Sequence, residues 1–218
     1  MIEKAVEQLF KSVPEYVTVV AAVKTRTVAE VEAAYRAGIR NFGHNYVQEA
    51  RAMIPSVNFK ASWHMIGHIQ RNKVNAVLGL FDMIETVDSV RLAKEIEKRA
   101  NQQEKKVRVL IEINSGREKN KTGILPEQAD VLVQAISEFK YLHLEGLMTM
   151  GPRFGDPEDS RPYFIETRRL FEKLESINLP NVKMHYLSMG MSNSYKVAID
   201  EGANVIRIGT LIFGSRPD

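Results

Sequence analysis

Residues 16 to 24 have the sequence YVTVVAAVK, an apolar and largely β-branched run that ends on Lys24. A run of this kind is typical of a strand that is buried on both faces, as in a parallel sheet. Lys24 would then lie at the mouth of the fold, where loss of solvent and nearby cations favour the neutral amine that attacks a carbonyl. A lysine that ends a strand more often lies in solvent, so the rest of the chain has to decide between these interpretations.

Seven further strand-like runs alternate with helical patterns, and the strands are predicted at 39–42, 62–66, 82–85, 107–113, 143–148, 183–188 and 204–208. Helices are predicted at 2–11, 28–37, 44–53, 70–79, 89–102, 127–138, 160–177 and 193–202. An open doubly wound sheet would need a glycine-rich turn after the first strand, and the segment KTRTVAE there has no glycine. Eight strands therefore favour an α/β fold, a single (β/α)8 TIM barrel over residues 1–218.

Two segments lie outside the regular alternation. The extra N-terminal helix at 2–11 is expected to cover the gap left by a missing helix after the eighth strand. The least regular stretch, MGPRFGDPEDSRP at 150–162, is expected to be a flexible insertion at the barrel mouth.

Composition excludes several classes of protein. The 30 basic and 27 acidic residues give a net charge of +3, spread along the chain, which is weak evidence for nucleic-acid binding. The absence of cysteine excludes disulfides and thiolate metal sites. The N-terminus, MIEKAVEQLFKSVPE, lacks the apolar core of a signal peptide, and no stretch approaches the roughly 20 apolar residues that cross a bilayer. The sequence therefore predicts a soluble cytoplasmic protein that binds neither nucleic acid nor membrane.

The loops after the seventh and eighth strands, SMGMSNS at 188–194 and RIGTLIFGS at 207–215, are rich in small residues. In a TIM barrel phosphate is often bound after these strands, because glycine lets the backbone approach an anion and helix-end amides point at it. Together the two loops predict a phosphate-binding cradle. The Ser192 hydroxyl has two competing roles here, ligand contact and N-cap of the helix predicted from residue 193.

Arg207 is expected to point into the barrel, because it alternates with Ile206 and Ile208 on the last strand. A buried guanidinium requires an acceptor. Lys24, a phosphate cradle and an inward arginine together suit pyridoxal 5′-phosphate (PLP). Its aldehyde condenses with lysine, its phosphate accepts from amides, and its ring nitrogen accepts from arginine.

Motifs along nearly the whole chain closely resemble the pyridoxal phosphate homeostasis protein family: VKT around Lys24, FGHNYVQE (42–49), WHMIGHIQRNK (63–73), INSGREKNKTG (113–123), EGLMTM (145–150), SMGMSNSYKVAIDEG (188–202) and RIGTLIFGSR (207–216). The resemblance implies a barrel similar to the N-terminal domain of bacterial alanine racemase. It also implies that PLP is held covalently, as an internal aldimine on Lys24.

The resemblance assigns further roles within the site. Ser192, Gly209 and Thr210 match positions that hold the phosphate, and Arg207 matches the arginine that faces the pyridine nitrogen. The family-like motifs also place near the cofactor Asn45, Ser188 and Met191. Asn45 has an alternative role, because with Gln48 it forms a helix capping-box pattern. His44 stands where the family commonly has glutamate, which is expected to remove a negative charge near the pocket.

Arg207 also bears on catalysis. A guanidinium stays protonated and gives the ring nitrogen no proton, so the ring is a poor electron sink for carbanion chemistry. With the sequence ending at Asp218, we expect no counterpart of the additional C-terminal domain of a racemase. The resemblance implies a regulator of intracellular PLP without established turnover, with PLP-dependent apoenzymes as candidate recipients. We expect no catalytic residue and a monomer. A PLP-dependent amino-acid racemase-like enzyme and a cofactor-free Schiff-base aldolase are the alternatives.

Other polar residues give weaker predictions. His64 and His68 have the spacing of a zinc-binding helix, but Gly67 lies between them and no glutamate does, so no metal site is predicted. Glu112 and Glu145 fall on predicted strands as a candidate carboxylate pair. Lys121 is a second candidate amine near the pocket, although a solvated loop is the favoured interpretation.

Overall fold

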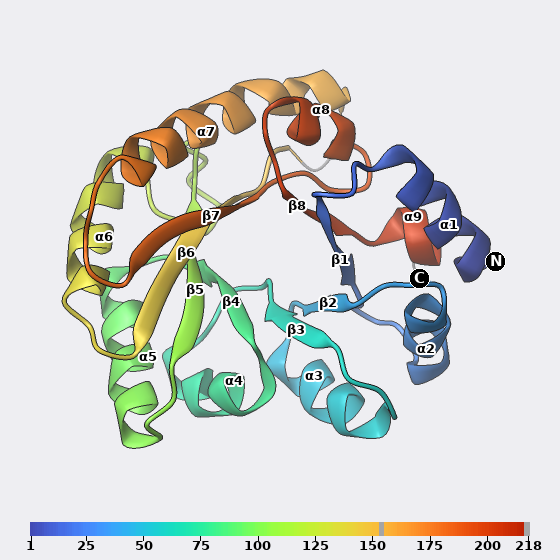
Figure 1. Cartoon of the computed structure of the whole chain (residues 1–218), viewed down its shortest axis with the longest axis horizontal. Coiled ribbons are helices and arrows are strands. Elements are labelled where there is room, and N and C mark those ends of the chain that lie inside the picture. The colour runs from blue at the N-terminus through green and yellow to red at the C-terminus, as the bar shows by residue number, and fades with distance from the viewer. Residues whose placement is uncertain (153–154, 216–218) are drawn as a thin grey trace.

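Eight parallel strands form a closed barrel in the computed structural model, which describes residues 1–152 and 155–215 (Figure 1). The strands follow one another in chain order around the barrel, and the eighth pairs back onto the first. The predicted (β/α)8 TIM barrel is therefore confirmed, as is the extra helix before the first strand.

Each predicted strand corresponds to a strand of the structure: β1 Thr18–Ala22, β2 Asn41–His44, β3 Ser62–Met65, β4 Met83–Val87, β5 Val107–Ile113, β6 Leu142–Thr149, β7 Val182–Ser188 and β8 Val205–Ile208. The α-helices are α1 Ile2–Ser12, α2 Val28–Arg36, α3 Val47–Met53, α4 Val74–Leu80, α5 Val90–Gln102, α6 Ala129–Ser137, α7 Arg161–Glu175, α8 Tyr195–Asp200 and α9 Thr210–Phe213. Short 3-10 helices lie at η1 Ile54–Ser56, η2 Arg71–Lys73, η3 Pro126–Gln128 and η4 Pro157–Ser160.

The barrel has an apolar outer layer and an interior that becomes polar toward the mouth. Side chains on the outward face of the strands, such as Phe42, Ile111 and Ile206, join the main apolar core with the surrounding helices. The inward face carries a small apolar cluster of Met83, Leu110 and Met148. This alternation follows from the strand period of two, and it places polar interior residues at the carboxyl ends of the strands.

The second strand begins later than predicted. The run from residue 39 was assigned to a strand, but the Ile39 amide donates to the Ala34 carbonyl at the end of α2, 3.1 Å away. Gly38, with φ of +114°, makes this turn possible, since glycine adopts the left-handed region without strain. As a result β2 extends to His44 and α3 begins only at Val47, which leaves Asn45 in the connecting loop.

The expectation that no helix follows the eighth strand was wrong. The single-turn helix α9 follows β8 directly, and α1 packs against it and against α2 (Figure 1). The N-terminal helix therefore covers a short helix instead of a gap. Part of the 150–162 insertion is regular, since η4 and the start of α7 lie in it, and residues 153–154 lie outside the described residues.

The joint between β7 and β8 has the least strand pairing of the barrel, since one register pair, Ser188 with Val205, joins the two strands. Backbone hydrogen bonds from the loop after β7 extend the contact between the two strands. The Met189 amide donates to the Val205 carbonyl, and the Arg207 amide donates to the Gly190 carbonyl. The loops that follow these two strands therefore lie side by side. Within the described ranges, no helix is both long and apolar enough to cross a membrane.

Candidate functional site

A cavity of about 450 Å³ opens at the carboxyl ends of the strands, where a TIM barrel carries its functional site. Its lining brings together six residues that the sequence placed at the site: Asn45, Met191, Ser192, Arg207, Gly209 and Thr210. Apolar walls come from Ala22, Ile66 and Met150. Lys24 and Ser188, the two remaining candidates, are not among the residues that line this cavity.

Lys24 lies two residues beyond Ala22, which lines the cavity, at the end of β1. Its side chain is half-buried, and its Nζ donates a hydrogen bond to the Tyr46 hydroxyl at 3.1 Å. The same Nζ lies 4.7 Å from the centroid of the Tyr46 ring. The amine is thus held by a partner beside the mouth. Sequence reasoning missed Tyr46, although the family-like motif FGHNYVQE contains it.

The two predicted phosphate loops are tied together through Ser192. Its Oγ accepts hydrogen bonds from the backbone amides of Gly209, at 3.2 Å, and Leu211, at 3.4 Å. The alternative role of Ser192 as an N-cap is wrong, because α8 begins only at Tyr195 and Ser194 precedes it. The Ser192 hydroxyl of the first loop and two backbone amides of the second therefore form one hydrogen-bonded group beside the cavity.

Gly209 leaves part of this wall open. A Cβ at this position would stand 3.7 Å from the Ala22 Cβ, which is ordinary van der Waals contact. Glycine is therefore not needed here to avoid a clash, and its effect is to leave space beside the amides where an anion can approach.

Arg207 points into the barrel from β8, as predicted, and is 5% exposed. Its Nη1 donates to the Ser188 hydroxyl at 2.5 Å, and its Nη2 donates to the Thr149 carbonyl at 2.8 Å. These bonds supply the acceptors that a buried guanidinium requires. Burial lowers the pKa of Arg207, while the nearby charges of Glu85 and Glu112 oppose this effect.

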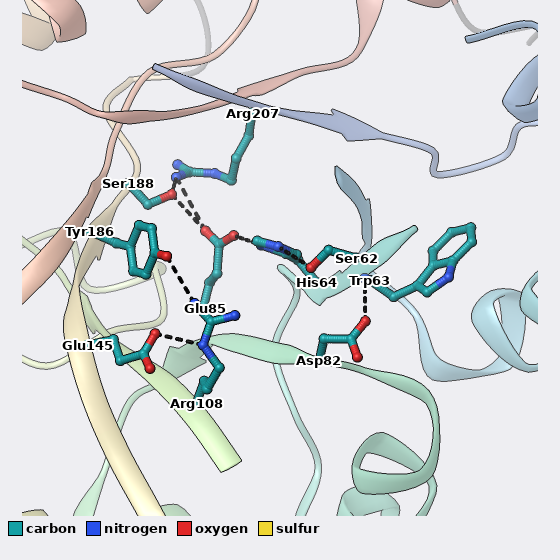
Figure 2. Close-up of polar contacts among 10 residues, drawn as sticks. All are labelled: Ser62, Trp63, His64, Asp82, Glu85, Arg108, Glu145, Tyr186, Ser188 and Arg207. Carbon is teal, nitrogen blue, oxygen red and sulfur yellow. Dashed lines mark hydrogen bonds and ion pairs between the residues drawn. The ribbon is translucent and has the colours of Figure 1, made fainter. Parts of the chain in front are cut away.

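A buried polar network continues below Arg207 (Figure 2). Glu85 of β4 is fully buried, and its Oε2 accepts from the Ser188 hydroxyl at 2.6 Å. Its Oε1 lies 2.6 Å from Nδ1 of His64. Burial alone would raise the pKa of Glu85. The pKa is nevertheless held below its usual 4.5 by three partners: His64, through its hydrogen bond and charge, Arg207, through its charge, and Ser188, through its hydrogen bond. Glu85 is therefore an ionised carboxylate inside the barrel.

His44 lies on the helix-facing side of β2, away from the cavity. Its ring packs 5.6 Å from the Trp63 ring centroid and 6.4 Å from that of Phe81. Among the described residues, neither ring nitrogen has a hydrogen-bond partner, and burial lowers the pKa of His44 from its usual 6.5 to about 4. The expected loss of negative charge near the pocket is therefore wrong, because residue 44 faces the outer apolar layer.

The capping box proposed for Asn45 and Gln48 is also wrong. The N-cap of α3 is Tyr46, and in the described part of the chain its side chain makes no capping hydrogen bond. Asn45 instead lies in the loop between β2 and α3, where it lines the cavity.

The remaining candidates have partners away from the cavity. Glu112 accepts from the Thr122 hydroxyl at 2.6 Å, whereas Glu145 pairs with Arg108, so the two carboxylates do not form a pair. Lys121 Nζ donates to Glu118 and to the Gly151 carbonyl. His64 binds Glu85. Among the residues that the structure describes, no three His, Asp or Glu side chains are grouped to hold a metal ion.

Comparison with known proteins places this barrel in a family. The model of the alanine racemase N-terminal domain matches residues 2–217. The pyridoxal phosphate homeostasis protein of Aquifex aeolicus is 40% identical over 196 residues, which cover 89% of this chain and 85% of the relative. That of Pasteurella multocida is 36% identical over 218 residues, covering 99% of this chain and 93% of the relative. The chain belongs to the pyridoxal phosphate homeostasis protein family.

Solved structures agree with this assignment. PipY of Synechococcus elongatus, with PLP bound, has a TM-score of 0.90 and 29% identity, and the match covers 98% of this chain and all of PipY. Alanine racemase of Clostridium difficile has a TM-score of 0.84 over all of this chain and 57% of the racemase. At 15% identity this second likeness concerns the fold alone.

The cavity of this homeostasis family member has the chemistry that PLP requires. The amides and hydroxyls around Ser192 suit a phosphate, the space beside Gly209 admits one, and Arg207 offers a donor deeper in the barrel. A volume of about 450 Å³ lies in the range of small-molecule sites. The residues present therefore fit this cofactor.

Proposed function

We propose that this protein binds PLP in the cavity at the barrel mouth and serves PLP homeostasis as a holder of the cofactor, without catalytic turnover. The observation on which this rests is the single cavity wall that joins Ser192, Gly209 and Thr210 to the buried Arg207, with Lys24 beside the mouth. These residues supply a binding site for an anion, a buried cation in Arg207 and an amine in Lys24.

Each group has a separate task in this proposal. Ser192, Gly209 and Thr210 hold the phosphate, and Arg207 donates to the ring nitrogen. The Lys24 amine, beside the cavity mouth, would be the group that holds the cofactor through its aldehyde. Asn45 and Met191 line the same cavity. The bound group supplies an electrophilic carbon in conjugation with a pyridine ring.

The charge pattern of the cavity supports a holding role over catalysis. Arg207 is the one charged side chain among the described residues that line it, and its bonds to Ser188 and Thr149 already engage two donors. An amino-acid substrate would need a further cation for its carboxylate. Moreover, a guanidinium does not protonate the ring nitrogen, which weakens the ring as an electron sink.

One observation favours the alternative, a PLP-dependent racemase-like enzyme. The Tyr46 hydroxyl lies 3.1 Å from the Lys24 amine, so two groups that exchange protons meet at the mouth. Steady racemisation or elimination of amino acids by the purified protein, lost in Lys24→Ala, would favour this enzyme over a holding protein.

Borohydride reduction followed by mass spectrometry tests the proposal. Protein expressed with ample vitamin B6 is expected to be yellow, and reduction is expected to fix the cofactor on the peptide that contains Lys24. Lys121→Ala is the matched control, because it removes a loop amine outside the cavity lining and is expected to leave the adduct intact. Absence of any reducible adduct on Lys24 would overturn covalent binding there, whereas a reduced substrate adduct without visible absorbance would indicate a cofactor-free aldolase.

The proposal extends to partners and location. We propose a cytoplasmic monomer that passes PLP to PLP-dependent apoenzymes. Sedimentation of the purified protein tests the monomer. Activation of a PLP-free transaminase by the loaded protein tests transfer, provided that transfer is faster than release of free PLP into solution.

A further inference from the structure

The buried network below the cavity links four strands, and the proposed cofactor contacts account for only one of its side chains, Arg207. His64 comes from β3, Glu85 from β4, Ser188 from β7 and Arg207 from β8 (Figure 2). Each of these side chains is at most 5% exposed, and Glu85 and Ser188 are completely buried. A buried carboxylate is costly unless its partners are well placed, so this arrangement calls for a reason.

The hydrogen bonds of the network all run toward Glu85. Arg207 Nη1 donates to Ser188 Oγ, and the single hydroxyl proton of Ser188 is donated to Glu85 Oε2. His64 donates to Glu85 Oε1 from Nδ1, because an ionised carboxylate only accepts. The closest approach of Glu85 Oε2 to the guanidinium is 3.9 Å, at Nη1. Glu85 is thus connected to Arg207 through Ser188 and not by a direct hydrogen bond.

This connection leaves Arg207 with donors to spare. A guanidinium has five N–H groups, and one on Nη1 and one on Nη2 are engaged by Ser188 and Thr149. Within the described part of the chain, the other three have no hydrogen-bond partner. Because Arg207 lines the cavity, a guanidinium locked from below can direct a donor at a ligand above it.

We propose that Glu85 is a positioning residue that orients the Arg207 guanidinium through Ser188, and that His64 holds Glu85 in place. The proposal rests on the proposed function, in which Arg207 donates to the PLP ring nitrogen. It reassigns Ser188, whose only proton is committed to Glu85, from cofactor contact to this positioning role.

A second buried carboxylate offers a matched control. Glu112 is 2% exposed and its charge also acts on Arg207, but its hydrogen bond goes to Thr122 and it does not line the cavity. Replacement of Glu112 removes a second buried carboxyl group, whose pKa is raised by burial, without cutting the connection through Ser188. A comparison of Glu85→Gln with Glu112→Gln therefore separates two effects: the orientation of the Arg207 guanidinium through Ser188, and a general change in the electrostatic environment of Arg207.

The first experiment uses the full-length protein stripped of PLP and follows the nitrogen-15 NMR signals of the arginine guanidinium groups. The Arg207 signals are assigned by their loss in Arg207→Lys. Locked Nη groups are expected to give separate signals in the wild type, Glu112→Gln and Ser188→Thr. In Glu85→Gln and Ser188→Ala these signals are expected to merge, because the guanidinium is released to rotate.

The second experiment measures PLP affinity by absorbance titration of the same variants. Glu85→Gln and Ser188→Ala are each expected to weaken binding about tenfold, the scale of one charge-assisted hydrogen bond. The double variant is expected to lose no more than the stronger single variant, because both changes cut one connection. Ser188→Thr, which restores a hydroxyl, is expected to restore affinity.

Three results would overturn the positioning role: wild-type Arg207 signals in Glu85→Gln, an equal effect of Glu112→Gln, or a double variant whose losses multiply. Circular dichroism checks that each variant is folded, and if Glu85→Gln is not, the pair Ser188→Ala and Ser188→Thr decides the NMR test. A wild-type protein that takes up no PLP would overturn the proposed function instead. In that case the NMR signals of Arg207 in the PLP-free protein would still decide whether Glu85 positions the Arg207 side chain.

Discussion

At the scale of single residues, His44 links stability to pH. Its pKa is about 4 in the folded protein against an ordinary 6.5, because burial among aromatic rings disfavours the charged form. Between pH 4 and pH 6.5 the unfolded chain binds a proton at His44 and the folded protein does not. The free energy of unfolding therefore keeps its full value above pH 6.5 and falls as the pH drops toward 4. The full difference corresponds to about 3 kcal/mol, of which about 2 kcal/mol is lost at pH 5.

His44→Phe is therefore expected to be less sensitive to acid than the wild type. Urea unfolding at pH 8 and pH 5 measures the change, and the loss on going to pH 5 is expected to be smaller by about 2 kcal/mol in the variant. His185→Gln, at an exposed strand position, is the control and is expected to keep the wild-type pH dependence. Equal pH dependence in the wild type and His44→Phe would contradict the assignment.

Gly209 gives a second prediction at this scale. Its φ of −113° is open to alanine, and the added methyl would make only ordinary contacts with Ala22. Gly209→Ala is thus expected to fold with a stability within about 0.5 kcal/mol of the wild type. The methyl would occupy the approach of the phosphate, and PLP binding is expected to weaken about tenfold in a spectral titration, equivalent to 1.4 kcal/mol.

Pyridoxal, which lacks the phosphate, provides the control for that prediction. Its weaker binding is expected to change little in Gly209→Ala, because the methyl stands where the phosphate would be. An equal loss for PLP and pyridoxal would place the phosphate elsewhere in the cavity.

Residue-scale predictions from sequence succeeded where a local pattern was enough. Alternation along β8 predicted that Arg207 points inward, and the two glycine-containing loops brought Ser192 and Gly209 to one wall. The acceptors of Arg207 were not predictable in this way. Ser188 and Glu85 are 103 positions apart in the sequence, and only closure of the barrel brings their side chains together.

At the scale of elements, Gly146 interrupts the regular pairing of β6. The register shifts next to it on both the β5 and the β7 side, and its φ is +153°. A Cβ there would lie 1.9 Å from the Tyr186 carbonyl oxygen, which belongs to the neighbouring strand. The three nearest atoms all belong to the Tyr186 backbone, so no flexible side-chain group can move aside.

Gly146→Ala is therefore expected to destabilise the fold by about 3 kcal/mol, measured as the free energy of unfolding in urea. Gly79→Ala in α4 is the matched control, because no described atom outside its own helix turn lies within 4 Å of the added methyl. That variant is expected to gain up to about 1 kcal/mol from the higher helix propensity of alanine. A neutral Gly146→Ala would show that β6 accommodates a regular strand here.

Element boundaries show why the sequence predicted the strands better than the loops. A buried strand has a mainly apolar, β-branched run, so β5 (VRVLIEI) was predicted with its observed bounds, Val107–Ile113. Ile39 is equally apolar, yet it belongs to the turn after α2 because its amide bonds to Ala34. An apolar pattern predicts which residues are buried. It does not predict the backbone hydrogen bonds that end a helix.

At the scale of the whole molecule, the sequence predicted the barrel because each strand and helix carries its own pattern, and the order of strands follows from short connections. The joint of the barrel with the least strand pairing was not predictable from these patterns. Strands β7 and β8 share one register pair, and the Arg207 side chain crosses from β8 to Ser188 of β7 and Thr149 of β6. The proposed phosphate site joins the loops that follow the same two strands.

PLP is therefore expected to stabilise this joint more than the rest of the barrel. A ligand that contacts both loops suppresses the local opening that exposes their amides, whereas the long β5–β6 pairing is already stable without it. Hydrogen–deuterium exchange followed by mass spectrometry, with and without PLP, measures the difference. Slower exchange is expected in peptides that cover 188–195 and 205–213, with little change in those that cover 107–113 and 142–149. Uniform protection of all strands, or protection confined to 107–149, would indicate that the ligand binds away from the β7–β8 joint.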